Sequence, residues 1–329
     1  MSSKRFITWT LAFTCISALS MAACSSDDSN GGGGSGGGGN FGGFGATGGS
    51  GATGGQAGSG GQAGSGGTGG GADAGPGPDH LLITEVGIQP GGSEYIEIMN
   101  PTSAAVDLSD YYVSDNSGYY TLTSGPWTFS GTPGSDFLAQ FPSGTMLQPG
   151  AVLVIAGEAA SGNDGFETLF GKCPDFTLNS TGTALSCGGG SVPAMKIPAN
   201  GSVGSSPGFL ISNDREMIVL FTWDGSSSTV KDVDYVTWGT TFDVNTRIDK
   251  TGKTGYQPDT QADQQKPADQ GVPASAGAPL AIERCAMETG EKTTGGNGIT
   301  GHDETSEDMS ASFKSAATPS PGTKNSCLP

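Results

Sequence analysis

The sequence predicts an all-β protein, an antiparallel β-sandwich with long loop insertions that follows a glycine-rich tether. Three observations support this prediction. Short runs rich in β-branched and aromatic residues recur between Gly, Pro, Asn and Asp turns, which is typical of sandwich proteins. Helical periodicity is nearly absent. Of the 59 glycines among the 329 residues, 27 fall within residues 31–77, so the glycine excess is confined to one segment.

The first predicted strands are four short runs, at residues 81–86, 94–99, 111–113 and 119–122. The second run alternates, which places Ile96 and Ile98 on one face of the strand. The third and fourth runs are separated by Asp, Asn, Ser and Gly at residues 115–118, a composition that favours a turn. This part of the chain is therefore expected to form a series of antiparallel strands.

Three later strands are predicted, at residues 151–156, 216–221 and 230–238. The continuous apolar run at 151–156 indicates a central strand. In the last strand we expect Val233 and Tyr235 to face the core, and Asp232 and Asp234 to face solvent. Residues 166–170 could form one helical turn. Polar stretches rich in Gly, Ser, Gln or Pro are expected to be loop insertions, at residues 124–140, 158–207 and 242–279.

The N-terminus has the pattern of an export signal. Lys4 and Arg5 precede an apolar segment that runs to about Leu19, which is shorter than the ~20 apolar residues of a membrane-spanning helix. The chain then becomes polar and acidic at residues 25–28. These features predict a signal peptide at residues 1–24.

The end of this signal is more specific. Met21, Ala22, Ala23 and Cys24 resemble the lipobox of bacterial lipoproteins, in which the cysteine is acylated and becomes the new N-terminus. The resemblance implies membrane attachment through lipid on Cys24, because several acyl chains give a stable anchor. The alternative is an ordinary secretory signal that leaves Cys24 free. Ser25, by resemblance to the sorting rule of enteric bacteria, indicates the outer membrane, with the domain in the periplasm or on the cell surface.

Residues 25–78 are predicted to be a disordered linker. They consist largely of Gly, Ser, Ala and Thr, which have no large apolar side chains. No burial of side chains can therefore offset the entropy cost of ordering this segment. The formal net charge of the chain is −18, and no Lys or Arg occurs between Arg5 and Lys172. This charge distribution argues against a nucleic-acid partner, because such binding requires clustered basic residues.

The domain predicted at residues 79–329 resembles a known family, the lamin-tail domain. The resemblance lies in residues 82–86, 94–98, 100–102, 106–115, 147–150, 233–239 and 319–325. It implies an immunoglobulin-like β-sandwich, and it identifies the chain as a bacterial lipoprotein that contains a lamin-tail domain. Lamin tails serve as interaction domains, so the resemblance implies a binding module. The chain is longer than a compact lamin tail because of the three insertions.

The cysteines predict two disulfides. Cys15 leaves with the signal and Cys24 is expected to take lipid, so an even number of cysteines remains in an exported chain. Of the three pairings of these four residues we favour Cys173–Cys187 and Cys285–Cys327. A zinc site is the other interpretation, but no C-x-x-C spacing occurs and the mature chain has only two histidines, His80 and His302.

Few residues indicate catalysis. Residues 204–208 match the G-x-S-x-G pattern, but Pro207 directly follows the second serine where a helix should begin. His80 and His302 are expected to be solvated loop residues. The carboxylate pairs Glu94/Glu97 and Asp232/Asp234 are interpreted as parts of edges or solvated acidic faces. No cofactor is predicted.

Two binding sites are considered instead. Acidic side chains near the C-terminus form the candidate calcium site: Asp303, Glu304, Glu307 and Asp308. Aromatic residues in and beside the first insertion form a candidate surface for a sugar or peptide: Trp127, Phe129, Phe137 and Phe141. The alternative for the aromatic group is that it covers one end of the sandwich, and the alternative for the acidic group is that it serves solubility.

Two functions follow from these features. The first is a cell-envelope lipoprotein whose domain binds a protein or glycan without catalysis. The second is an envelope hydrolase with a carboxylate-based site in the insertions. A cleft lined by two inward carboxylates, or by a carboxylate and His302, would favour the hydrolase. A convex face with exposed aromatic side chains would favour binding.

Overall fold

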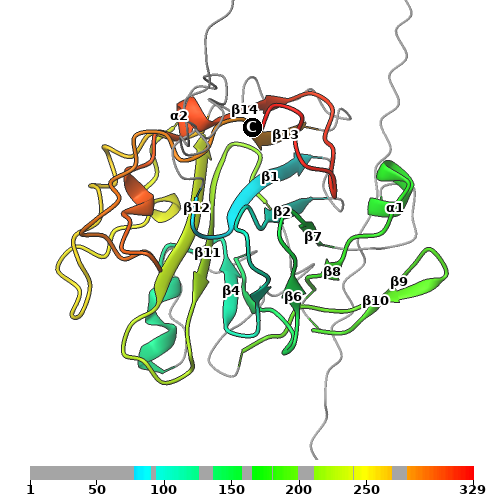
Figure 1. The fold of residues 1–329 in the computed structure, drawn as a ribbon, viewed down its shortest axis with the longest axis horizontal. Coiled ribbons are helices and arrows are strands. Elements are labelled where there is room, and N and C mark those ends of the chain that lie inside the picture. Colours follow the sequence, from blue (N-terminus) through cyan, green and yellow to red (C-terminus); the bar gives the residue numbers. More distant parts are fainter. Residues whose placement is uncertain are drawn as a thin grey trace, which may run out of the picture. The chain divides into compact units, whose positions relative to one another are not determined.

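The protein is described here by a computed structural model, which covers residues 78–89, 94–125, 136–157, 165–179, 181–198, 211–239, 241–268 and 280–329. The described part is mostly β, with several antiparallel sheets, as predicted (Figure 1). The signal peptide, Cys24 and the linker lie outside the described residues. Among the described residues, no helix is long and apolar enough to cross a membrane.

The larger sheet has six strands, in the order β14-β13-β1-β2-β7-β8. Their bounds are Phe313–Ala316 for β14, Leu280–Arg284 for β13, Leu82–Gln89 for β1, Tyr95–Met99 for β2, Val152–Ala156 for β7 and Phe176–Thr177 for β8. All pairs are antiparallel except β7 with β8. The first strand of the domain therefore pairs with β13, which lies near the end of the chain.

The second sheet has four strands, in the order β12-β11-β4-β5. They are β12 (Lys231–Gly239), β11 (Arg215–Thr222), β4 (Tyr111–Ser114) and β5 (Leu138–Gln140). Two short pairs complete the strands: β3 (Val106–Asp107) with β6 (Met146–Leu147), and β9 (Leu185–Cys187) with β10 (Gly190–Val192).

The helical elements are short. They are α1 (Phe166–Phe170), α2 (Met309–Ser312) and the 3-10 turns η1 (Tyr119–Ser124), η2 (Val244–Thr246) and η3 (Glu304–Ser306). The single turn expected at residues 166–170 is present as α1. The strand expected at residues 119–122 was wrong, because these residues form η1, whose Tyr119 hydroxyl is buried against Asp232.

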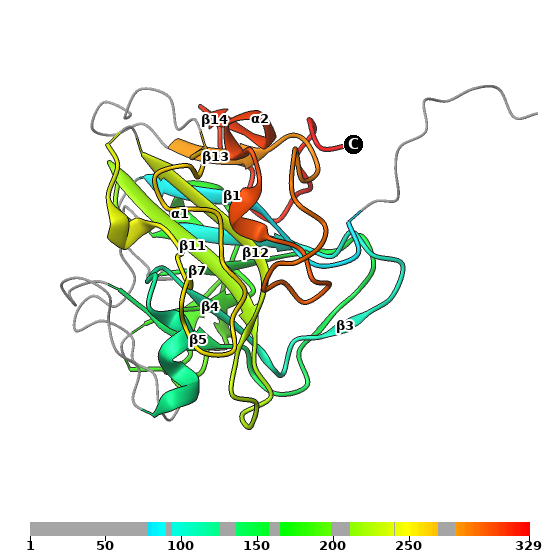
Figure 2. The same ribbon diagram turned by 90° about the vertical axis from the view of Figure 1, so that its left-hand side faces the viewer.

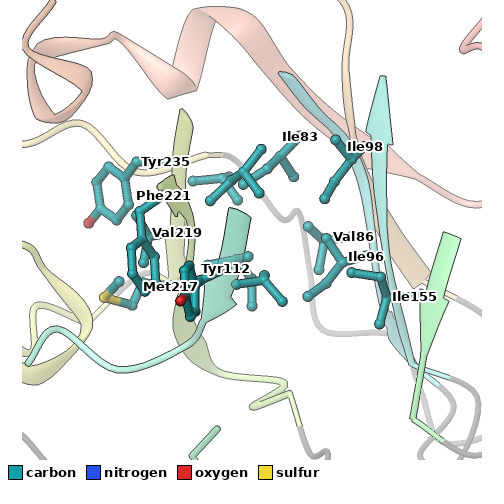
Figure 3. Close-up of a cluster of buried hydrophobic side chains, with 14 of the residues drawn as sticks. Ile83, Val86, Ile96, Ile98, Tyr112, Ile155, Met217, Val219, Phe221 and Tyr235 are labelled. Atoms are coloured by element: carbon teal, nitrogen blue, oxygen red, sulfur yellow. The ribbon is translucent and has the colours of Figure 1, made fainter. Parts of the chain in front are cut away.

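The hydrophobic core lies between the two sheets, as Figure 3 shows. Ile96 and Ile98 of β2 point into this core, as their alternation predicts. Ile83 and Val86 of β1 also point into it, although residues three positions apart in a regular strand lie on opposite faces. A register shift between Ile83 and Glu85 allows both to face the core.

Segments outside the strands cover the outer faces of both sheets. In Figures 1 and 2 the yellow and orange segments, around residues 241–268 and 285–312, lie along β12 on the face away from β1. On the larger sheet, the backbone N–H groups of Ser320 and Gly322 donate to Glu85 (3.0 Å) and Glu97 (2.7 Å). Both sheets therefore have two covered faces, which the pattern of alternation in their strands did not indicate.

Candidate functional site

Two polar regions lie beneath the segments that cover β12. The first is an ion-pair network around Arg284, at the end of β13, and Lys250, in the 241–268 segment. Both side chains are fully buried. Arg284 contacts Asp234 (Nη2 to Oδ1, 2.8 Å) and Glu307 (Nη1 to Oε1, 2.7 Å), and its Nε donates to the Ile83 carbonyl at 3.0 Å. Burial raises the pKa of Asp234 to about 7, and the charge of Arg284 opposes that rise.

Lys250 forms similar ion pairs near the start of β12, where Asp232 lies. Its Nζ lies 2.7 Å from Asp232 Oδ2 and 3.2 Å from Asp259 Oδ2, and it donates to the Tyr119 hydroxyl at 2.9 Å. Burial opposes its charge, but Asp232 and Asp259 raise the pKa of Lys250 above its usual value. Each of these buried carboxylates therefore has a cation bonded to it.

The network corrects one expectation from the sequence. Val233 and Tyr235 face the core as predicted, and Asp232 and Asp234 face the other way. That other face is not solvated, because Asp232 and Asp234 are each only 1% exposed. The residues that bury Asp232 come partly from 242–279, so this insertion is a structural cover for the sheet.

Glu94 and Glu97 are also buried, which corrects their assignment to a solvated edge. Glu97 accepts from the Thr84 hydroxyl at 2.7 Å and from the Gly322 N–H. Burial raises the pKa of Glu97 to about 7 and the pKa of Glu94 to about 8. Oε2 of Glu94 is buried without a hydrogen-bond donor among the described residues.

The second polar region, which we call the His–Glu cluster, contains His80, Glu288, Glu291, His302 and Glu304. His80 lies two positions before the start of β1, and the other four residues lie between β13 and the end of η3. Contrary to the expectation of a solvated loop histidine, the His80 side chain is only 2% exposed. The two histidine rings lie edge to face, with centroids 5.6 Å apart.

The histidines bridge the carboxylates. His80 Nδ1 lies 3.0 Å from Asp79 Oδ1, and His80 Nε2 lies 2.5 Å from Glu288 Oε1 and 3.9 Å from Glu304 Oε2. His302 Nδ1 lies 3.1 Å from Glu291 Oε2. Within each of three triplets the polar atoms lie within 4.8 Å of one another: Asp79, His80 and His302; His80, Glu288 and Glu304; Glu288, Glu291 and His302.

Glycines allow the cluster to close. A Cβ at Gly296 would lie 2.0 Å from the His302 carbonyl oxygen, and one at Gly298 would lie 2.6 Å from Glu304 Oε1. Gly298 N–H donates to the His302 carbonyl at 2.9 Å. A side chain at either position would push residues 302–304 away from His80, so these close approaches require glycine.

The three carboxyl groups of the cluster outnumber its two histidines. Burial and the nearby Glu288 carboxylate raise the pKa of Glu291 to about 8, and burial and Glu291 raise the pKa of Glu304 well above its usual value. Burial opposes a charge on His80, but its hydrogen bond to Glu288 raises the pKa to about 9. Among the described residues, Oε1 of Glu291 and Oε1 of Glu304 are buried without a hydrogen-bond donor. Glu288 is paired with His80, but Glu291 and Glu304 have no lysine or arginine partner among the described residues, unlike the carboxylates of the ion-pair network.

A cleft of about 310 Å³ opens onto the cluster. Its walls include Asp79, Glu288, Glu291 and His302, together with Pro78, Met287 and Thr293. The cleft contains three carboxylates and His302, an arrangement that would favour a hydrolase. It lies outside the three insertions in which the hydrolase alternative placed its site.

The sequence did not identify Glu288 and Glu291 as site residues. The signal available was their position: both lie between Cys285, which a disulfide holds beside β13, and His302. Both favoured disulfides are present, Cys173–Cys187 and Cys285–Cys327.

The candidate calcium ligands do not form one site. Lys292 contacts Asp303 at 3.1 Å, Arg284 contacts Glu307, and Lys266 contacts Asp308 at 2.5 Å. Of the four, only Glu304 belongs to the His–Glu cluster. The acidic group is thus divided between ion pairs and the cluster.

The candidate aromatic surface is also divided. Phe137 and Phe141 are fully buried in the core, so the expectation of exposed aromatic side chains was wrong for these two. They fit the alternative, in which the aromatic group closes the sandwich. Trp127 and Phe129 lie outside the described residues, as does the G-x-S-x-G pattern at residues 204–208.

The comparison with protein families agrees with this β-rich architecture. The profile of the Lamin Tail Domain family matches residues 75–240. Among solved structures, the chain is similar to a DUF4876 family protein from Bacteroides thetaiotaomicron, with 16% identity and a TM-score of 0.40, over 75% of this chain and 74% of the other. No curated protein sequence matches the chain.

Proposed function

The chain belongs to the lamin tail domain family, and from this premise we propose that it is a lipid-anchored protein of the cell envelope whose domain binds a protein or glycan without catalysis. The anchor is Cys24 in the outer membrane, and the domain faces the periplasm or the cell surface.

One structural observation carries the non-catalytic part of the proposal. The carboxylates Asp232, Asp234 and Glu307 are buried in ion pairs with Lys250 and Arg284. A carboxylate held in this way has no access to a substrate. These groups support the fold by joining the covering segments to β12, which leaves the outer surface of the domain for recognition.

Acyl labelling tests the anchor. We expect cells fed a labelled fatty acid to label the wild-type protein, and expect Cys24→Ala to lose the label and leave the membrane fraction. Cys15→Ala is the matched control, because this cysteine lies within the predicted signal and should not affect labelling. Protease treatment of intact cells then reports whether the domain lies outside. Unchanged membrane retention of Cys24→Ala would reject the anchor.

The hydrolase is the second candidate, and the cleft at the His–Glu cluster favours it. Glu291, with its pKa raised to about 8 by burial and Glu288, would remain protonated and act as an acid. Burial also acts on Glu288, but the His80 hydrogen bond lowers its pKa, so it would be ionised and act as a base. Two nearby carboxyl groups with opposite shifts are a pattern of acid–base sites.

Hydrolysis assays separate the two candidates. Wild type, Glu291→Gln and the control Glu167→Gln are compared on chromogenic glycosides, esters and peptides. The binding module predicts rates equal to the buffer blank for all three proteins. If wild type and Glu167→Gln turn over a substrate and Glu291→Gln does not, the protein is a hydrolase and the proposal of a non-catalytic binding module is rejected.

A further inference from the structure

We propose that the His–Glu cluster binds one divalent transition-metal ion of the zinc class, through His80 Nε2 and the carboxylates of Glu288 and Glu304, with Glu291 or His302 completing the site from the cleft. This inference does not depend on the proposed function.

The donor set is the first argument. Imidazole nitrogen and carboxylate oxygen together suit zinc and neighbouring metals, whereas calcium takes oxygen ligands. Both histidines of the chain after the predicted signal peptide lie in this cluster, together with three glutamates. This set has the composition of zinc sites in which a cleft supplies the last ligand or a water molecule.

The orientation of His80 is the second argument. Its Nδ1 donates to Asp79 Oδ1, so Nε2 points at Glu288 and Glu304. A carboxylate on one ring nitrogen that fixes the other nitrogen toward the ion is the usual outer shell of a metal-bound histidine. Asp79 is therefore a positioning residue, because its carboxylate acts on the ion through His80.

The distances are the third argument. Two atoms that each lie ~2.0–2.2 Å from one zinc ion are about 3–4 Å apart. His80 Nε2 and Glu304 Oε2, at 3.9 Å, fit this spacing. His80 Nε2 and Glu288 Oε1, at 2.5 Å, are closer because a proton joins them. Binding would replace that proton with the ion, and the Glu288 carboxylate would move back by about 1 Å to reach the ligand spacing.

The unsatisfied oxygen atoms are the fourth argument. Glu304 has a side chain only 2% exposed, yet its Oε1 has no N–H or hydroxyl donor among the described residues, and its carboxyl group shares a hydrogen bond only with the carboxyl group of Glu291. Burying a carboxylate without a partner is costly, and in the neighbouring network Arg284 or Lys250 removes that cost. A bound cation would supply the missing positive charge.

Metal binding to the full chain tests the proposal. The protein is purified in detergent without a histidine tag, treated with EDTA and titrated with Zn²⁺ in competition with a chromogenic chelator. A parallel titration with Co²⁺ follows visible absorption. We expect one Zn²⁺ per chain, a Co²⁺ spectrum that saturates at the same ratio, and no competition from Ca²⁺.

Variants assign the ligands. His80→Gln and Glu304→Gln should each weaken Zn²⁺ binding by ~100-fold or more, and Asp79→Asn by about 10-fold as a positioning residue. Glu167→Gln, which contacts Gly188 at 2.9 Å in another part of the domain, should bind like wild type. Circular dichroism checks that each variant folds. If His80→Gln does not fold, the isosteric Glu304→Gln decides.

Two results would overturn the site. One is the absence of stoichiometric binding of Zn²⁺ and Co²⁺ by the wild-type protein. The other is binding with unchanged affinity in folded Glu304→Gln. Neither result bears on acylation of Cys24, so the failure of this inference and the failure of the proposed function are distinguishable.

Discussion

The ion-pair network and the His–Glu cluster are neighbouring regions built from the same kind of residue, but they differ in one component. In the network, Arg284 and Lys250 bond directly to each buried carboxylate. In the cluster, two histidines accompany three glutamates, and two carboxylate oxygens have no donor among the described residues. The presence of a long basic side chain therefore separates the region that stabilises the fold from the region where we propose a metal ion.

The largest effect should come from removing the cation of the network. Arg284→Met leaves Asp234 and Glu307 buried and unpaired, and we expect it to lower the free energy of unfolding by about 3–5 kcal/mol. Urea unfolding measures this loss. The control is Lys314→Met on β14, whose side chain is 56% exposed and 3.6 Å from Glu283. A loss for Arg284→Met no larger than that of the control would show that the network is not structural.

Glu307 and Glu304 provide the sharpest contrast, because they lie three positions apart but in different regions. Glu307→Gln removes the charge that pairs with Arg284 and should cost about 2–3 kcal/mol. Burial and Glu291 raise the pKa of Glu304 well above its usual value, so folding at neutral pH must protonate this carboxyl group. Glu304→Gln removes that cost and should stabilise the metal-free protein by about 1–2 kcal/mol. Thermal unfolding in EDTA compares the two. The same sign for both variants would contradict the distinction between the regions.

Glu94 tests the cost of an uncompensated carboxyl group outside both regions. Its pKa is raised by burial from 4.5 to about 8, so the folded state favours the protonated form. The contribution of Glu94 to the free energy of unfolding is therefore greatest below the pKa of the unfolded chain, 4.5, and decreases as the pH rises through about 8. We expect the total decrease to be about 1–3 kcal/mol. We expect the melting temperature of wild type, relative to Glu94→Gln, to fall over this interval. A constant difference between the two proteins would mean that Glu94 is hydrated.

The smallest effect should come from an exposed pair. Lys266 Nζ lies 2.5 Å from Asp308 Oδ2, but the Lys266 side chain is 63% exposed. Solvent screens such pairs, so Lys266→Ala should change the free energy of unfolding by less than about 1 kcal/mol. Urea unfolding in low and high salt measures this. A loss as large as that of Arg284→Met would mean that burial does not set the strength of these pairs.

Much of the fold was predictable because strand patterns report which side chains meet between the sheets. Ile96 and Ile98, and Val233 and Tyr235, were assigned to the core from alternation alone, and they lie there. Alternation does not report what covers the opposite face. The burial of Asp232 depends on Lys250, which arrives from an irregular segment without periodicity.

The His–Glu cluster was not predictable for a related reason. His80 and His302 lie at opposite ends of the domain sequence, and they meet because β1 pairs with β13, after which the Cys285–Cys327 disulfide holds the following segment. Metal-site motifs of sequence rely on short spacings between ligands. His302 and Glu304 are close in the sequence, but His80 is far from both, so no such motif includes it. The pairing of β1 with β13 was the missing information.

The end of the chain has a consequence for how the domain assembles. Residues 320–325 bond to Glu85, Glu97 and Thr84, and Cys327 is joined to Cys285. A polypeptide that emerges from a ribosome or a translocation channel with its N-terminus first cannot complete the outer side of β1 and β2 until these last residues appear. The outer side of these two strands is therefore completed only after residues 320–325 have appeared, and until then Glu85 of β1 and Glu97 of β2 remain in water.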